Sequence, residues 1–123
     1  MGDADPYGGE LDQIVDQRSH DAIVNKKSQV ANVPLVILVT SSTPRSRTLL
    51  PLVVELSRNN EFKQAGVKWY EMQLTEKTAP MIKFGPQNCP IVVLLRGSYC
   101  ETLLGISGVE EVERKVGQMV DRS

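Results

Sequence analysis

The sequence predicts an α/β fold, with a buried strand in the middle of the sheet, a hairpin near the end of the chain, and helices after both. The stretch Val33 to Val39 is apolar and rich in β-branched residues, which is typical of a strand covered on both faces. The apolar run Ile91 to Leu95 follows Pro90, and proline belongs at the first residue of a strand or at an edge. Helix-start signals follow both strand regions.

The N-terminal part is expected to hold a tail, a short element and a helix. Residues 1–9 are rich in Gly, Pro and Asp and predict a flexible tail, whereas 10–123 predict one domain. Leu11–Asp16 fits either an edge strand or the start of a helix. Ser19–Lys27 predicts a short helix capped by its first residue. His20 is the single histidine and has no cysteine nearby, so we expect it to bind no metal.

A longer helix is predicted directly after the central strand. Thr43 is a favourable N-cap, and Pro44 is a favourable first helical residue. Pro51 should bend this helix because it removes one backbone hydrogen bond. The helix is expected to end at Asn59-Asn60, and a turn or a short helical extension follows. Four apolar residues at helical spacing are expected to form its buried stripe: Leu49, Leu52, Val53 and Leu56.

The second half of the chain predicts a third strand, the hairpin and a last helix. Val67–Leu74 has strand composition, and its alternation assigns Glu71 to the less covered face. Gly97-Ser98 has the composition of a hairpin turn. Ser107 is expected to cap the last helix, with Glu110 reaching back to it.

Composition excludes several classes of function. The formal net charge is -1 and no run of Lys and Arg occurs, so the chain lacks the positive field that nucleic-acid binding needs. The longest apolar stretch, Val33 to Val39, is far shorter than the roughly 18 residues of a membrane span. The acidic start of the chain is wrong for a signal peptide, so we expect a cytoplasmic protein. No motif indicates a cofactor or a metal.

The chain has two cysteines, Cys89 and Cys100. In an intracellular chain they are expected to be free thiols. Cys89 precedes the first hairpin strand and Cys100 lies just past the turn, so antiparallel pairing should hold them far apart.

The order of these signals resembles the thioredoxin fold. Its marks here are the central strand, a helix with an internal Pro51, a hairpin begun at Pro90, Gly105 in the second hairpin strand, and a C-terminal helix. The resemblance implies a three-layer sandwich with a central mixed sheet of four or five strands flanked by helices. It also implies a first strand at Leu11–Asp16, a short helix over Thr75–Phe84, and a cis bond between Cys89 and Pro90.

The resemblance also shows what this chain lacks. Thr43-Pro44-Arg45-Ser46 falls where the thioredoxin family carries its two-cysteine motif, and Ile37 falls at that family's buried acid. Dithiol exchange needs a reactive thiolate and a second thiol to resolve the mixed disulfide. Since Thr43 and Ser46 cannot form a disulfide, we expect no dithiol-disulfide oxidoreductase activity and, on balance, no enzyme.

Among relatives without the cysteine pair, the sequence resembles the thioredoxin-like domain of phosducin-like proteins. The likeness rests on Glu76-Lys77, Ala79-Pro80, Pro90 and Leu94-Leu95-Arg96-Gly97, and it covers Val33 to Val120. It implies an adaptor of the kind that works with chaperonins or G-protein βγ subunits. The chain has almost none of that family's N-terminal helical region, so only the general adaptor role carries over.

The sequence and the resemblance together predict a binding site at the helix start that follows the central strand. The helix start could hold an anion at its exposed N–H groups, or its hydroxyl residues could simply cap the helix. Together with the segment before the hairpin, it would form a groove for another protein or an extended peptide. The predicted groove residues are Ser42, Thr43, Pro44, Arg45, Ser46, Cys89 and Pro90.

The alternative function is a single-cysteine thiol-redox or glutathione-binding protein that uses Cys89 beside a cis-Pro90. The positive helix end and Arg45 would lower the pKa of the Cys89 thiol. The plainer interpretation makes Cys89 a small buried apolar residue. Cys100 is expected to serve packing alone.

Overall fold

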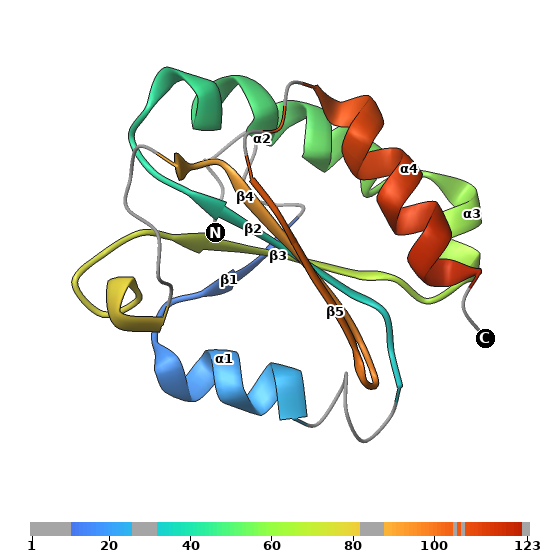
Figure 1. The fold of residues 1–123 in the computed structure, drawn as a ribbon, viewed down its shortest axis with the longest axis horizontal. Helices are drawn as coiled ribbons and strands as arrows, with labels where there is room; N and C mark the ends of the chain where they lie inside the picture. The colour runs from blue at the N-terminus through green and yellow to red at the C-terminus, as the bar shows by residue number, and fades with distance from the viewer. Residues whose placement is uncertain (1–10, 26–31, 82–87, 105, 107, 122–123) are drawn as a thin grey trace.

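The computed structural model describes most of the 123-residue chain and defines ten helices and strands (Figure 1). The described residues are 11–25, 32–81, 88–104, 106 and 108–121. The expected tail 1–9, Gly105 and Ser107 lie outside them. The elements are β1 (Asp12–Ile14), α1 (Gln17–Ile23), β2 (Leu35–Thr40), α2 (Pro44–Leu56), α3 (Asn60–Gln64), β3 (Lys68–Gln73), η3 (Ala79–Met81), β4 (Ile91–Arg96), β5 (Tyr99–Leu103) and α4 (Val109–Val120).

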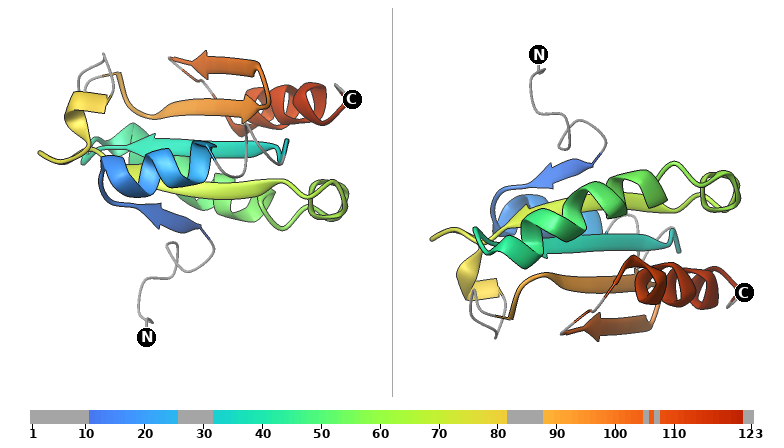
Figure 2. Two further views of the ribbon diagram at one scale, coloured as in Figure 1. Left: turned by 90° about the horizontal axis from the view of Figure 1, so that it is seen from below. Right: turned by 90° about the horizontal axis from the view of Figure 1, so that it is seen from above.

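The strands form one mixed sheet of five strands in the order β1-β3-β2-β4-β5. β1 and β2 both run parallel to β3, whereas β4 runs antiparallel to β2 and β5 antiparallel to β4. Helices α2 and α4 lie over one face of the sheet and α1 over the other (Figure 2). The predicted α/β sandwich is confirmed, and Leu11–Asp16 contributes a strand rather than a helix.

The hydrophobic core is divided by the sheet into two clusters. The cluster under α2 and α4 includes Val36 and Leu38 of the central strand, and the cluster on the α1 side includes Ile37 and Val39. All four side chains are inaccessible or nearly so. The central strand is therefore covered on both faces, as its apolar composition predicted.

Helix α1 starts earlier than the sequence predicted. Its N-cap is Asp16, whose side chain accepts a 2.9 Å hydrogen bond from the Ser19 backbone N–H. The Ser19 hydroxyl accepts a 3.2 Å bond in return from the Asp16 backbone N–H. Ser19 is thus the third helical residue of a reciprocal capping box rather than the cap itself.

Helix α2 begins as predicted, and its buried stripe departs from the predicted one at Leu52. Thr43 is its N-cap and Pro44 its first residue. Leu52, expected in the stripe, is 41% exposed, whereas Ser46 is buried. The buried face passes through Ser46, Leu49 and Val53, at intervals of three and four residues, and this rotation turns Leu52 toward solvent.

The connections after α2 resolve two open predictions. Asn59 accepts hydrogen bonds from the N–H groups of Glu61 and Phe62 and caps α3, so the expected turn or extension is a short helix. Of the predicted helix Thr75–Phe84, residues 75–81 are described, and they form a turn over 76–78 followed by a 3₁₀ helix, Ala79–Met81. Residues 82–87 lie outside the described residues.

The last helix lacks a side-chain N-cap, whereas a strand residue binds its C-terminal end. Its N-cap is Gly108 rather than Ser107, so no side chain makes the capping bond, although Glu110 and Glu111 in the first turn suit the helix dipole. At its C-terminus, Arg96 Nη1 donates to the carbonyl oxygens of Met119 and Val120 at 3.1 and 2.9 Å. A strand side chain therefore satisfies carbonyls that the helix leaves unpaired.

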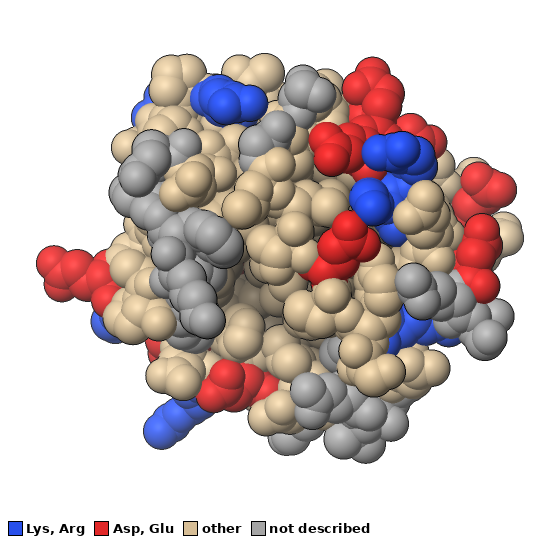
Figure 3. All heavy atoms as spheres, in the orientation of Figure 1, with Lys and Arg blue, Asp and Glu red and all other residues tan. Residues whose placement is uncertain are grey.

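Charged side chains of both signs are interspersed on the face shown in Figure 3. No helix in the described part of the chain is long and apolar enough to cross a membrane.

Candidate functional site

Three hydroxyl groups meet where the central strand ends and α2 begins. The Ser41 hydroxyl donates to the Thr43 hydroxyl at 3.2 Å, and the Thr43 hydroxyl donates to the Ser46 hydroxyl at 3.1 Å. The Ser46 hydroxyl also accepts a 3.1 Å bond from the Ser41 backbone N–H. Hydrogen bonds among its own residues thus hold the loop between β2 and α2 in this conformation.

The other predicted features of this helix start serve structure as well. Thr43 accepts a 3.4 Å hydrogen bond from the Ser46 backbone N–H, which is the expected capping bond. Arg45, expected to add charge for an anion or a thiolate, donates at 3.3 Å to the Ile106 carbonyl before α4. These contacts match the capping interpretation of the helix start.

Cys89 lies directly beside this loop. Its bond to Pro90 is cis, which confirms the prediction. Residue Cys89 is 2% exposed, and its sulfur shares a hydrogen bond with the Ser41 side chain. Burial raises the pKa of the Cys89 thiol above its ordinary value, and the Ser41 bond opposes that shift only in part. The expected lowering of this pKa is therefore wrong, because desolvation outweighs the Ser41 hydrogen bond.

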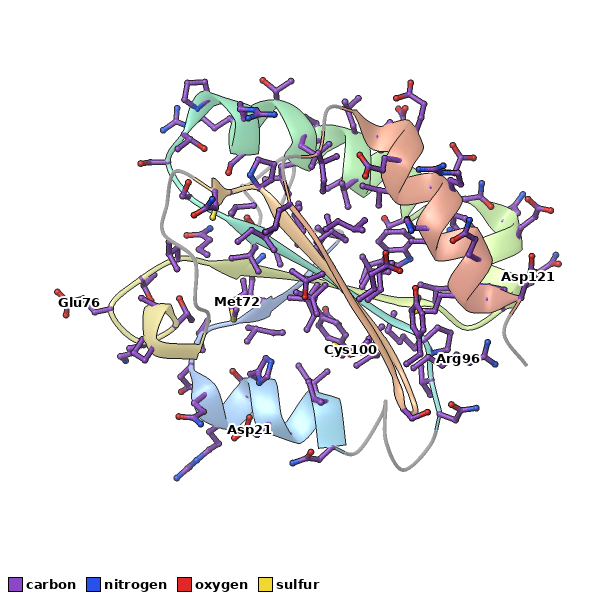
Figure 4. The ribbon with its side chains drawn as sticks, in the orientation of Figure 1. Asp21, Met72, Glu76, Arg96, Cys100 and Asp121 are labelled. Atoms are coloured by element: carbon purple, nitrogen blue, oxygen red, sulfur yellow. The ribbon has the colours of Figure 1, made fainter. Side chains whose placement is uncertain are left out.

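The second cysteine is separate from the first. Cys100 lies on the outer strand β5 and pairs with Leu95 of β4 (Figure 4). Both thiols are free, and Cys100 is exposed. The expectation of two free thiols is confirmed.

A cavity of about 770 Å³ opens at the carboxyl ends of β2 and β3, next to the start of α2. Open α/β sheets commonly bind ligands at this edge. Of the predicted groove residues, Ser42 and Ser46 line this cavity, and the remaining five do not. The lining residues are Thr40, Ser41, Ser42, Ser46, Arg47, Leu50, Glu71, Gln73, Leu74, Thr75, Glu76 and Ala79.

Glu71 is the main departure from the sequence analysis. Strand alternation placed it on the less covered face, yet it is 3% exposed and lines the cavity. Its Oε2 accepts a 2.9 Å bond from the Thr40 hydroxyl, and its Oε1 accepts a 2.8 Å bond from Gln13 Nε2. The face that carries Glu71 also carries Trp69, which packs in the cluster under α2 and α4. Because helices α2 and α4 cover that face, the prediction from strand alternation that Glu71 is less covered was wrong.

A sequence signal for this edge of the sheet did exist, although it did not single out Glu71. Thr40 and Gln73 are polar residues at the ends of two strands that pair in parallel, and they stand opposite each other in the register. Because carboxyl ends of neighbouring parallel strands share one edge of the sheet, polar residues there gather. Only the pairing of β2 with β3, however, brings Glu71 to Thr40.

Metal-binding groups do not gather in the described residues. No group of three or more His, Cys, Asp or Glu side chains in that part of the chain could hold a metal ion. His20 Nδ1 lies 3.1 Å from Asp21 Oδ1, on the next residue of α1.

Solved structures with the same architecture are numerous. Thioredoxin O1 of Arabidopsis thaliana matches 89% of this chain and 96% of its own with a TM-score of 0.70 and 19% identity. The chain has a thioredoxin-like fold. A mutant thioredoxin of Halobacterium salinarum matches 99% of both chains (TM-score 0.70, 15% identity). Spinach chloroplast thioredoxin f matches 94% of this chain and 98% of its own (TM-score 0.70, 10% identity).

At identities this low, the likeness establishes the thioredoxin-like fold alone. No protein-family description matches the sequence, and no curated protein does either.

Proposed function

We propose that the chain is a thioredoxin-fold module that binds another protein and carries out no dithiol-disulfide exchange. The observation that carries this proposal is the hydroxyl pair at the start of α2. Thr43 and Ser46 stand where the thioredoxin resemblance puts the two cysteines, and their hydroxyls are hydrogen-bonded at 3.1 Å. Two hydroxyls in this arrangement cap a helix and transfer no electrons.

The remaining thiols do not replace the missing pair. Exchange requires an accessible thiolate and a second thiol that can attack the mixed disulfide. Cys89 is buried with a raised pKa, and Cys100 is exposed on another strand. This arrangement supports a non-redox role, and it gives the single-cysteine alternative no support.

The binding role is supported by two likenesses. The resemblance to phosducin-like proteins implies an adaptor. A structural neighbour, a thioredoxin f2 solved in complex with ferredoxin:thioredoxin reductase, shows that the same fold can present a protein-binding surface (TM-score 0.71, 15% identity). For this chain, the proposed contact surface is the exposed part of the predicted groove, which comprises Ser42, Pro44 and Arg45. Of the other groove residues, Ser46, Cys89 and Pro90 are buried.

The first test is reduction of insulin with dithiothreitol as the electron source. The native chain should give no turnover above the dithiothreitol background. Turnover like that of an ordinary thioredoxin would overturn the non-redox part of the proposal.

The second test concerns binding. The immobilised chain is exposed to cell extract beside two matched variants, Ser42→Tyr in the groove and Ser98→Tyr in the hairpin turn, both at exposed positions. We expect the native chain and Ser98→Tyr to retain the same protein and Ser42→Tyr to lose it. Equal retention by all three, or retention by none, would contradict the proposed surface.

A further inference from the structure

We infer that the cavity beside Glu71 receives the cationic end of a lysine or arginine side chain of the partner. This inference rests on the proposed protein-binding function and names the chemistry that the partner must present.

The first step is the environment of the Glu71 carboxylate. Both of its hydrogen bonds come from neutral donors, the Thr40 hydroxyl and the Gln13 amide. Buried carboxylates are commonly paired with a cation, and an ionised carboxylate has about four acceptor positions. Among the described residues Glu71 has no ion-pair partner, and Arg47, which lines the same cavity, makes no ion pair with it. Acceptor capacity therefore remains for a donor that enters the cavity.

The second step is the shape of the cavity. Leu50, Leu74 and Ala79 supply apolar walls, and Ser42 and Thr75 supply hydroxyl groups. Lysine and arginine carry an apolar stem and a charged end, so they bury the stem against apolar surface. A cavity of about 770 Å³ holds such a side chain together with its neighbouring residues.

The third step is the sign of the charge. Of the cavity-lining residues that the structure describes, Glu71 and Glu76 carry negative charge and Arg47 alone carries positive charge. Glu76 projects outward on the loop after β3 (Figure 4). A cationic side chain is therefore attracted at the outer side and paired at the inner carboxylate, whereas an anion is disfavoured at Glu71.

A purely structural role for Glu71 predicts a different result in a binding experiment. In that case its carboxylate only ties β3 to Gln13 of β1 and Thr40 of β2, and occupancy of the cavity does not depend on its charge. The experiment below separates the two roles by the charge of the probe.

The probes are the peptide acetyl-Gly-Lys-Gly-amide, the same peptide with norleucine in place of lysine, and the free diamine cadaverine. Binding is followed by NMR titration of the native chain, Glu71→Gln and Glu113→Gln. The last variant removes the same charge from an exposed position on α4. We expect the lysine peptide to shift resonances of residues around the cavity, and Glu71→Gln to weaken it at least tenfold. Glu113→Gln should stay within twofold of native, and the norleucine peptide should bind at least tenfold more weakly.

Three results would overturn the inference. They are equal binding of the lysine and norleucine peptides, unchanged affinity in Glu71→Gln, and binding of cadaverine at least tenfold tighter than the lysine peptide, which would assign the cavity to a free small amine. If Glu71→Gln does not fold, Ala79→Trp decides, because it fills the cavity from the exposed 3₁₀ turn and leaves the Glu71 bonds in place. That variant should also weaken the lysine peptide at least tenfold.

Retention of the partner separates this inference from the proposed function. A partner retained equally by the native chain and by Glu71→Gln would leave the binding function standing and overturn the inference. Binding of the lysine peptide at Glu71 without any retained partner would leave the cation preference of the cavity standing and would contradict the proposed binding function.

Discussion

The Thr40 hydroxyl donates a 2.9 Å hydrogen bond to Glu71 Oε2 across the two neighbouring parallel strands β2 and β3. Leu38 is the register partner of Glu71, so Thr40 reaches it diagonally from two residues further along. Both side chains are buried. This bond, with that of Gln13 on the other oxygen, fixes a carboxylate at the one end of the sheet where the cavity opens.

Removing this donor should destabilise the protein. In Thr40→Val the shape is nearly kept, but Glu71 Oε2 loses its neutral donor in a buried position. A buried acceptor left unsatisfied costs about 1–3 kcal/mol, so we expect the free energy of unfolding in urea to fall by that amount. The matched control is Thr102→Val on β5, where the side chain is exposed and the change should stay within about 0.5 kcal/mol. Equal effects at both positions would contradict a role for the Thr40–Glu71 bond.

Restoring the cysteine pair tests the position assigned to the missing motif. The double variant Thr43→Cys with Ser46→Cys places two thiols at the N-cap and first turn of α2. The helix end favours the thiolate of the first cysteine, so this variant should gain insulin-reducing activity that the native chain lacks. Either single variant is the control and should gain none, because no second thiol resolves the mixed disulfide. A double variant that forms no disulfide would show that the motif lies elsewhere.

The raised pKa of Cys89 predicts slow alkylation. With Cys100→Ser as background, iodoacetamide labelling of Cys89 should rise only at a pH above that of an ordinary thiol near 8.5. With Cys89→Ser as background, the exposed Cys100 serves as the reference. Labelling of Cys89 at a lower pH than Cys100 would contradict the effect of burial.

The raised pKa of the Cys89 thiol also predicts how the stability of the protein changes with pH. A thiol whose pKa is higher in the folded state than in the unfolded chain stabilises the folded state. This stabilisation is complete below the pKa of the unfolded chain and is lost as the pH rises through the pKa of the folded state. The free energy of unfolding of the native chain should therefore fall above about pH 8.5. Cys89→Ala should show a weaker fall over the same range of pH.

Two leucines of α2 offer a test of its rotation. Leu49 is 5% exposed and Leu52 is 41% exposed, three residues apart on the same helix. Leu49→Ala should cost about 2–5 kcal/mol of unfolding free energy, because it empties a core position. Leu52→Ala should cost less than about 1 kcal/mol, because its side chain is already largely in water. Comparable losses in urea unfolding would show that α2 buries the stripe that the sequence predicted.

Part of the candidate site could be read from neighbouring residues. Thr43 and Pro44 together predict a helix start, and this position places Ser42 and Ser46 at the site. Glu71 could not be found in this way. Its partner Thr40 is 31 residues distant, and strand alternation alone gave it the wrong environment.

By itself, the sequence determined the doubly buried central strand and the Thr43 cap, whereas the cis bond before Pro90 was implied by the resemblance to the thioredoxin fold. The cap depends on the stereochemistry of adjacent residues, and the strand follows from its unbroken apolar composition, so a local pattern predicts both. The tertiary structure decided the burial of Glu71, the exposure of Leu52 and the direction of the Cys89 pKa shift. Each of these depends on which helix covers which face of the sheet, and on the rotation of that helix. Such contacts join residues far apart in the chain, and their desolvation is set only when the layers pack.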